Sequence, residues 1–193
     1  MNIILGSQSP RRRELMGGLD IPFTSVNIHA DETFPSSLQA GDIPLYIARE
    51  KADAYVSRLQ DDDLLVTSDT IVWLNNRMLG KPQDIQEAKQ MLAQLSNSTH
   101  QVYTAVCFTS RKSGHIEQYS FVDKTDVTFR ELTTEEIDYY VEHYRPLDKA
   151  GAYGIQEWIG YIGVTSIEGS YFNVMGFPIQ KVYTFLLNHH CIP

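Results

Sequence analysis

The sequence has little cysteine and no long apolar run. Its 193 residues include two cysteines, Cys107 and Cys191, whose spacing matches neither a metal site nor a disulfide framework. The apolar stretch at residues 2–5 is soon followed by Arg11, so we expect neither a signal peptide nor a membrane span there. These shortages indicate a globular protein of the cytoplasm, a reducing compartment, with no membrane as partner.

Positive charge is also scarce. The chain carries 16 lysine and arginine residues against 24 aspartate and glutamate residues, which gives a net charge of −8. Such a balance argues against a nucleic-acid polymer or an anionic membrane as the partner. The length allows a substantial core, and no repeat, linker or low-complexity tract divides the chain. We therefore expect a single domain over residues 1–193, in which any anion-binding basic residues form a local cluster.

The most informative local pattern lies near the start of the chain. Residues 2–5 predict a strand, and residues 7–13 then read Ser-Gln-Ser-Pro-Arg-Arg-Arg before a helical pattern. Ser9 suits the N-cap of that helix, and Pro10 suits its first position. A strand, a glycine turn and a capped helix leave backbone N–H groups free to bind an anion.

Three arginines, Arg11, Arg12 and Arg13, stand in the first turn of this helix. The positive end of a helix dipole favours carboxylates, so guanidinium groups are electrostatically unfavourable there. A multiply charged anion such as a triphosphate, held between the arginines and the helix, would remove the conflict. A solvated basic face is the alternative, and this segment alone favours neither interpretation.

Two more charged residues interrupt apolar patterns. Lys51 lies on the flank of the apolar face of a helix predicted over 44–59, where a lysine usually extends to water. Asp69 lies inside an apolar run over 64–74, which predicts two short strands or one bent strand. A carboxylate there is costly unless it has a partner or a task. Because ligands bind at strand ends in α/β sheets, a functional Asp69 is favoured over one that caps a turn.

The rest of the chain alternates helical and strand patterns. Residues 23–28 predict a strand, and residues 101–110 and 115–129 predict a hairpin. Helices are predicted after the N-caps Asp84 and Thr133 and after Pro178. The apolar residues of the last helix, expected to face inward, are Ile179, Val182, Tyr183 and Leu186. Between the last two helices, residues 148–177 are glycine-rich, which lets backbone approach a ligand or a strand closely.

Taken in this order, the chain closely resembles the Maf family of nucleoside triphosphate pyrophosphatases, also described as septum-formation-inhibitor-like proteins. The matching segments span nearly the whole chain: residues 7–12, Asp31-Glu32, residues 48–52, Ser68-Asp69-Thr70, Gly80-Lys81-Pro82, residues 149–156 and Gly169-Ser170-Tyr171. The resemblance implies an α/β fold with two lobes, a bent mixed sheet flanked by helices and a central cleft, similar to the inosine-triphosphate pyrophosphatases. It also implies hydrolysis of a nucleoside triphosphate to the monophosphate and pyrophosphate with a divalent cation, Mg²⁺ or Mn²⁺. It is compatible with a homodimer.

The resemblance also implies roles for individual residues. Asp69 would be the general base or the carboxylate that positions water, and Glu32 would join Asp69 in holding the metal. The residues expected to hold phosphates are Ser9, Arg11, Arg12, Lys51 and Lys81. With the resemblance in view, the functional interpretation of these cations overtakes the surface alternatives. Lys149 matches a family lysine, but its role stays open.

Base specificity is also implied by the resemblance. Arg11, Thr70 and Gln156 match the positions that distinguish the subfamily acting on dTTP and UTP. A departure is Glu157, where that subfamily usually has glycine, and a carboxylate beside Gln156 can reshape the pocket. The leading hypothesis is therefore a dTTP and UTP pyrophosphatase. The alternatives are a nucleotide-binding regulator of cell division and a pyrophosphatase that removes modified nucleotides.

Overall fold

The computed structural model describes residues 1–192, which fold as two compact units. Unit 1 comprises residues 1–69, 104–123 and the chain from Gly176 onward, and unit 2 comprises residues 70–103 and 124–175. The strands form a mixed sheet in the order β2 (Thr24–Val26), β1 (Asn2–Gly6), β3 (Asp63–Leu74), β5 (Thr99–Lys112), β6 (His115–Phe129) and β7 (Val164–Glu168), with β4 (Arg77–Leu79) paired to β3. Pairing is parallel between β1 and its neighbours β2 and β3, and antiparallel for β3–β4 and β6–β7. The expected α/β fold with a mixed sheet flanked by helices is thus confirmed.

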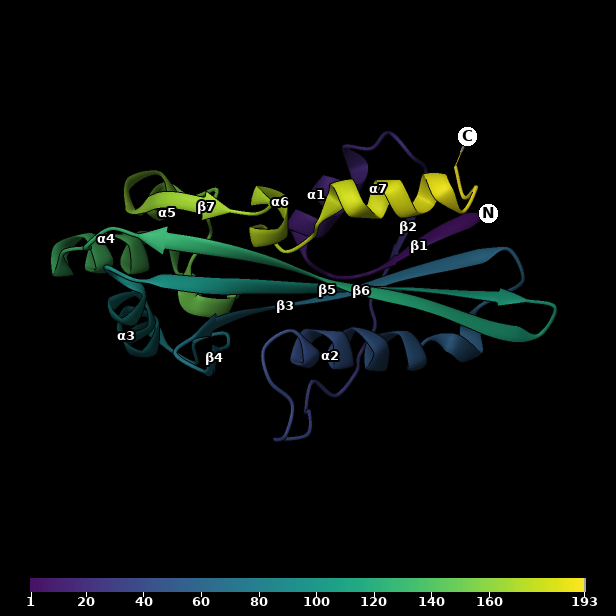
Figure 1. Cartoon of the computed structure of the whole chain (residues 1–193), viewed down its shortest axis with the longest axis horizontal. Helices are drawn as coiled ribbons and strands as arrows, with labels where there is room; N and C mark the ends of the chain where they lie inside the picture. The colour runs from purple at the N-terminus through teal and green to yellow at the C-terminus, as the bar shows by residue number, and fades with distance from the viewer. Residues whose placement is uncertain (193) are drawn as a thin grey trace. The chain divides into compact units, whose positions relative to one another are not determined.

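Unit 1 holds the N-terminal strands and the C-terminal helix. Its complete elements are β1 (Asn2–Gly6), α1 (Pro10–Gly17), β2 (Thr24–Val26), α2 (Asp42–Asp53), the 3₁₀ turn η1 (Val56–Arg58) and α7 (Ile179–Asn188). Three long strands begin in one unit and end in the other: β3 (Asp63–Leu74), β5 (Thr99–Lys112) and β6 (His115–Phe129). Within unit 1, α2 covers one face of the strands, and α1 and α7 cover the other (Figure 1).

The two faces of unit 1 have separate cores. On the α1 and α7 side, Leu5, Met16 and Phe108 belong to a cluster that also includes Leu186. On the α2 side the side chains are smaller, with Ala48 and Ala52 packed on Leu65, Ala105 and Cys107. Small residues on this face let α2 approach β3 closely, which matters because both elements carry predicted site residues. This packing is supported by the Thr67 hydroxyl, which donates to the carbonyl of Ala48 at 2.7 Å.

Unit 2 holds the remaining elements around a single core. They are β4 (Arg77–Leu79), α3 (Ile85–Leu95), α4 (Thr134–Tyr144), η2 (Ala150–Ala152), α5 (Trp158–Gly163), β7 (Val164–Glu168) and α6 (Tyr171–Val174). Their core includes Leu92, Phe129, Tyr140 and Ile159. Both predicted N-caps are confirmed: Asp84 accepts from the Glu87 N–H, and Thr133 forms a capping box with its helix. Among residues 1–192, no helix is long and apolar enough to cross a bilayer.

Three details of the predicted elements were wrong. The helix predicted over 44–59 ends at Asp53, because the tighter turn η1 follows and brings buried Leu59 back towards the start of β3. The strand predicted over 23–28 is shorter, since only Thr24–Val26 pairs with β1 at the edge of the sheet. Tyr183 is 40 % exposed, because it lies at the margin of the apolar stripe of α7. The run over 64–74 belongs to one continuous strand, which excludes Asp69 as a turn cap.

Candidate active site

The loop between β1 and α1 has the predicted local structure. Ser9 is the N-cap of α1, and its hydroxyl accepts from the backbone N–H of Arg12 at 3.5 Å. The Ser7 hydroxyl accepts from the Ser9 N–H at 3.2 Å, which tightens the turn after the strand. Pro10 is the first helical residue, as expected. The first turn of α1 also carries Arg11, which is half-buried.

Arg12 connects this helix start to two other segments of unit 1. Its Nε donates to the carbonyl of Gly176 at 2.8 Å, and its Nη1 donates to the carbonyl of Ser68 at 2.8 Å. Burial lowers the pKa of the Arg12 guanidinium, although the charge of Asp69 acts in the opposite direction. Two of the five N–H donors of this side chain therefore orient the group. Arg12 fixes the position of α1 beside the segment of β3 that carries Asp69.

The structure brings together three of the predicted site residues, Glu32, Lys51 and Asp69. Lys51 Nζ lies 2.8 Å from Asp69 Oδ1 and 2.9 Å from Glu32 Oε1. Exposure is 12 % for the Lys51 side chain, 13 % for that of Asp69 and 53 % for that of Glu32. The prediction from α2 alone, that Lys51 extends to water, was wrong. Its ammonium group is the shared partner of a largely buried carboxylate and an exposed one.

The surroundings of Asp69 act on its pKa in opposite directions, with burial as the largest effect. Burial raises its pKa above the ordinary value, and the nearby Lys51 and Arg12 charges act in the opposite direction. A carboxylate with a raised pKa is a stronger base, which suits a group that takes a proton from water. Burying this charge costs free energy, which indicates that Asp69 has a functional role at this position in β3.

The same carboxylates suit a hard divalent cation. Mg²⁺ and Mn²⁺ favour oxygen ligands, and Mg²⁺ is commonly held by one or two carboxylates while it keeps several waters. Oxygen atoms of Glu32 and Asp69 converge on one point, where Lys51 Nζ lies. Within residues 1–192, no group of three or more histidine, cysteine, aspartate or glutamate residues is placed for a metal ion. A cation at this point would therefore depend on water or phosphate oxygens for its remaining ligands.

The other predicted residues belong to unit 2. Thr70 follows Asp69 in β3 and is half-buried, and Lys81 is exposed just after β4. The Gly151 N–H donates to the Gly80 carbonyl at 3.0 Å, so the glycine-rich segment is tied to the residue before Lys81. Gly151 has φ 68°, and a Cβ there would lie 2.9 Å from a methyl group of Val72. Glycine is required at this position by both conformation and space.

Gln156 ends that segment in an arrangement suited to recognition. Its Oε1 atom is buried and has no hydrogen-bond partner among residues 1–192. Its backbone carbonyl accepts from the Tyr161 hydroxyl at 2.7 Å, which holds the main chain in place. A buried, unpaired amide oxygen is costly in a folded protein, so it points to a ligand that supplies a donor.

Sequence reasoning missed the residues that surround this segment. Glu157, expected to alter the pocket, directs its carboxylate towards Tyr140 and Lys149 instead. Tyr153 donates or accepts a hydrogen bond with His100 Nε2 at 2.7 Å, and both side chains are buried. In the sequence, Tyr140 stands at helical spacing with the apolar residues Ile137 and Val141. A buried tyrosine hydroxyl needs a hydrogen-bond partner, and this requirement was the signal that could have indicated a polar contact for Tyr140.

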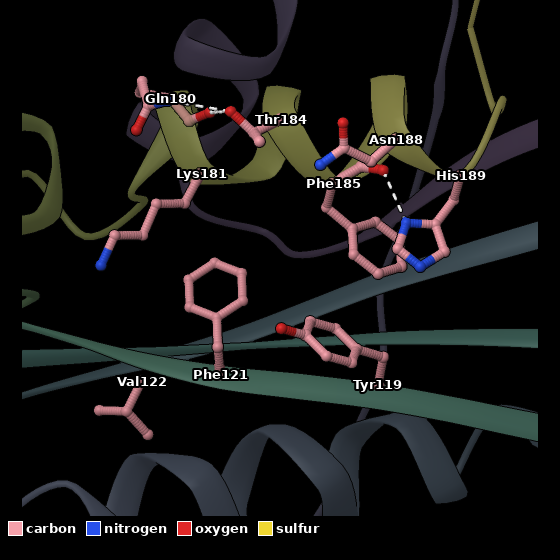
Figure 2. A pocket seen from close by; sticks show the side chains of 9 residues that line it. All are labelled: Tyr119, Phe121, Val122, Gln180, Lys181, Thr184, Phe185, Asn188 and His189. Atoms are coloured by element: carbon pink, nitrogen blue, oxygen red, sulfur yellow. Dashed lines mark hydrogen bonds between the residues drawn. The ribbon is translucent and has the colours of Figure 1, made fainter.

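A separate groove in unit 1 contains none of the predicted site residues. It has a volume of about 390 Å³ and lies between β6 and α7, where Tyr119, Phe121 and Phe185 line it (Figure 2). His189 stacks on Phe185 at 4.0 Å between ring centroids. Lys181 is paired with Asp123 at 2.6 Å, so its charge is already matched. The groove has the lining of a packing surface and offers no cluster of acids for phosphate chemistry.

Comparison with known proteins agrees with the features above. The chain is 55 % identical to a dTTP/UTP pyrophosphatase of Phocaeicola vulgatus, over 95 % of this chain and 94 % of that protein. It is 54 % identical to a protein of the same name from Bacteroides thetaiotaomicron, over 94 % and 92 %, and 51 % identical to one from Flavobacterium psychrophilum, over 97 % and 94 %. Among solved structures, the Ham1 protein of Staphylococcus aureus is similar in fold. Its TM-score is 0.52 at 14 % identity, over 98 % of this chain and all of that chain. The family described as Maf-like protein matches residues 2–189, and the chain belongs to that family.

Proposed function

We propose that this protein hydrolyses dTTP and UTP to the nucleoside monophosphate and pyrophosphate. Three relatives at 51–55 % identity, each named dTTP/UTP pyrophosphatase, support this substrate class. The observation that carries the proposal is the largely buried Asp69 carboxylate, whose pKa is raised and which shares Lys51 with Glu32. The reaction needs a base that accepts a proton from the attacking water, and it needs positive charge near the phosphate oxygens.

In the proposed reaction, a water oxygen attacks the α-phosphorus and the bond to the β-phosphate oxygen breaks. Asp69 orients that water and accepts its proton, because its raised pKa makes it a stronger base than an ordinary aspartate. Pyrophosphate leaves with the bonding electron pair. Positive side chains offset the charge that develops on the oxygen atoms, which is commonly the largest contribution to such a rate enhancement.

Phosphate binding is assigned to the residues around the start of α1 and to two lysines. Arg11 supplies a guanidinium fork at the helix N-terminus, where backbone N–H groups also favour an anion. Arg12 is held by donation from its Nε and Nη1 to backbone carbonyls, which places its guanidinium charge beside the start of α1. Lys51 and Lys81 supply point charges. Ser9 caps the helix, and its hydroxyl can also donate to phosphate.

Glu32 and Asp69 would hold a divalent cation, Mg²⁺ or Mn²⁺. When bound, it would supply positive charge beside the phosphate oxygens. The geometry that supports this assignment is the convergence of both carboxylates on Lys51 Nζ. An ammonium ion and a metal ion are alternative partners for those oxygen atoms.

Base recognition is assigned to Gln156, with Arg11 and Thr70. Uracil and thymine present a carbonyl, an N–H and a carbonyl along one edge, and a glutamine amide can match two neighbouring groups. The buried Gln156 Oε1 without a partner would accept the ring N–H. Cytosine has an acceptor at that ring nitrogen, so it leaves the buried amide oxygen unpaired and is rejected.

One assay tests the proposal. Purified protein is given dTTP, UTP, CTP, ATP, GTP and modified pyrimidine triphosphates, each with Mg²⁺ and with Mn²⁺, and pyrophosphate release is measured. We expect kcat/KM for dTTP and UTP to exceed that for CTP by at least about tenfold. Release of inorganic phosphate in place of pyrophosphate would refute the reaction, and equal values for UTP and CTP would refute the base assignment. A much higher value for a modified nucleotide would instead favour removal of damaged nucleotides.

A further inference from the structure

Glu157 adjoins the proposed base-recognition residue but does not point into open space. Its carboxylate accepts a hydrogen bond from the Tyr140 hydroxyl, and its other oxygen lies 3.2 Å from Lys149 Nζ. Its side chain is 21 % exposed, that of Lys149 is 9 % exposed, and Tyr140 is fully buried. Both carboxylate oxygens are therefore held by partners within unit 2.

Tyr140 connects this carboxylate to the backbone of the glycine-rich segment. Its hydroxyl donates to Glu157 and accepts from the Gly154 N–H at 3.0 Å. Burial and the bond to Glu157 raise the pKa of Tyr140, so the hydroxyl remains protonated and keeps its donor role. The Tyr140 side chain on α4 therefore holds the main chain of Gly154 and the side chain of Glu157.

The space around Gly154 shows how closely these groups pack. A Cβ at this position would lie 2.8 Å from the Glu157 carboxylate carbon. The Glu157 N–H also donates to the Gly154 carbonyl at 3.0 Å, which closes a tight turn over residues 154–157. Gln156 lies inside that turn. Its orientation is consequently determined by the positions of residues on either side of it.

We propose that Lys149, Glu157 and Tyr140 form a positioning network that fixes the 154–157 turn and so sets the preference of the enzyme for uracil and thymine over cytosine. The inference rests on the proposed function, in which Gln156 reads the base. Gln156 touches the base, whereas the three network residues act through it. The network sharpens selectivity because a buried amide with one allowed orientation cannot rotate to satisfy a different base.

A purely structural role is the main alternative, and energetics give it limited support. A buried ion pair loses much of its attraction to the cost of removing two charges from water, so it is weak evidence for stability. Lys149 also has a second partner, Asp148, at 2.7 Å, which is 60 % exposed. An apolar pair would fill the same space at less cost. The contribution of the polar network is the set of directional hydrogen bonds that fix the 154–157 turn.

The experiment combines two measurements on the wild type and on the Tyr140→Phe, Glu157→Ala and Glu157→Gln variants. The first is hydrogen exchange of the Gly154 amide in the ligand-free protein, which needs no activity. The second is the ratio of kcat/KM for UTP to that for CTP. In Tyr140→Phe and Glu157→Ala we expect Gly154 exchange to accelerate and the ratio to fall, each by about tenfold or more. Glu157→Gln keeps an acceptor for Tyr140, so both effects should be smaller.

Glu136→Gln is the matched control. Glu136 is also in unit 2 and lies four residues before Tyr140 in α4, but its carboxylate pairs with Arg130 at 2.7 Å and accepts from the Thr133 N–H at 2.9 Å, so it does not hold the 154–157 turn. This variant should lower Tm without changing Gly154 exchange or the UTP-to-CTP ratio. A ratio that falls equally in the control would show that the measurement reports general destabilisation, and the inference would be wrong.

The remaining outcomes separate the inference from the proposed function. A wild type that prefers UTP, with variants that keep its ratio, overturns the inference alone, even if Gly154 exchanges faster. Unchanged Gly154 exchange in Tyr140→Phe also overturns it, because the hydroxyl would not be holding the turn. A wild type that hydrolyses UTP and CTP equally refutes the base assignment and the selectivity role together.

Discussion

Replacing Asp69 by asparagine is the most direct test of the proposed chemistry. Asparagine keeps the size of the side chain and an oxygen that can accept from Lys51, but it removes the negative charge and nearly all basicity. The Lys51 Nζ to Asp69 Oδ1 contact at 2.8 Å would become an ordinary hydrogen bond. Lys51 keeps its ion pair with Glu32 at 2.9 Å, so its charge is not left without a partner.

The expected loss of activity is large and the expected loss of stability is small. General-base catalysis contributes about 10²- to 10⁴-fold, so kcat should fall by that factor. Burial raises the pKa of Asp69, which means that the fold disfavours its charged form. Removing the charge relieves that cost while it weakens the attraction of Lys51. Because the two effects oppose each other, we expect Tm to change by no more than about 5 °C.

The assay measures pyrophosphate release from UTP under saturating Mg²⁺, with circular dichroism and thermal unfolding on the same samples. Asp63→Asn is the control, since Asp63 is a buried carboxylate six residues earlier in β3. It accepts from the Asn2 side chain at 3.2 Å and from the Gln60 N–H at 2.9 Å, and neither partner is a proposed site residue. Its substitution should alter stability and leave kcat within about threefold of the wild type.

Titration with the metal ion then separates the two roles given to Asp69. A ligand role predicts that high Mg²⁺ or Mn²⁺ restores much of the activity of Asp69→Asn, because weaker binding is overcome by concentration. A base role predicts that kcat stays low at every concentration. Near-normal kcat in a correctly folded Asp69→Asn protein, at the Mg²⁺ concentration that saturates the wild type, would refute both roles and the reasoning behind them.

Three further substitutions give independent checks. Lys51→Met should lower kcat/KM for dTTP, UTP and CTP alike by roughly 10- to 100-fold, and unchanged kinetics would make Lys51 a packing residue. Gln156→Glu should erode the preference for UTP over CTP, since it replaces an amide donor with a charge, and a retained preference would contradict the assigned role. Burial lowers the pKa of His100 to about 4, so the stability it contributes is complete above about pH 6.5 and falls towards pH 4 by up to about 3 kcal/mol. Urea unfolding from pH 4 to 7.5 should show a shallower dependence in His100→Phe, and equal slopes would argue against this linkage.

Most of the fold could be predicted because local signals agreed with the final structure. Ser9, Asp84 and Thr133 are N-caps in the sequence and in the structure, since a short polar side chain before an apolar stripe has few other uses. Element ends were less certain. The end of α2 at Asp53 depends on where the chain must turn to enter β3, and no residue near Asp53 encodes that requirement.

Some residues of the proposed site could also be predicted from the sequence, and others could not. Asp69 was visible because a carboxylate contrasts with the apolar strand around it, and the structure gives it the cationic partner that such a residue needs. The partner itself was not visible. The helical spacing of α2 shows only where Lys51 lies on that helix. The packing of α2 on β3 is what brings its ammonium group to Asp69 and Glu32. Glu32 lies in a polar segment, so its charge does not stand out from its neighbours, and the sequence pattern alone does not mark it as a site residue.

The glycine-rich segment shows why a residue type is not enough to assign a role. Lys81 follows Gly80, Lys149 lies two residues before Gly151, and both match the family, so residue type alone does not separate their roles. In the structure Lys149 is buried, and its charge is matched by Glu157 at 3.2 Å and Asp148 at 2.7 Å. Lys81 is exposed and pairs with no carboxylate among residues 1–192. A lysine whose charge already has two partners gains little from phosphate, whereas one without a partner gains a full ion pair. Of the two, Lys81 is therefore the residue to assign to the substrate, and Lys149 belongs to the network that holds Gln156.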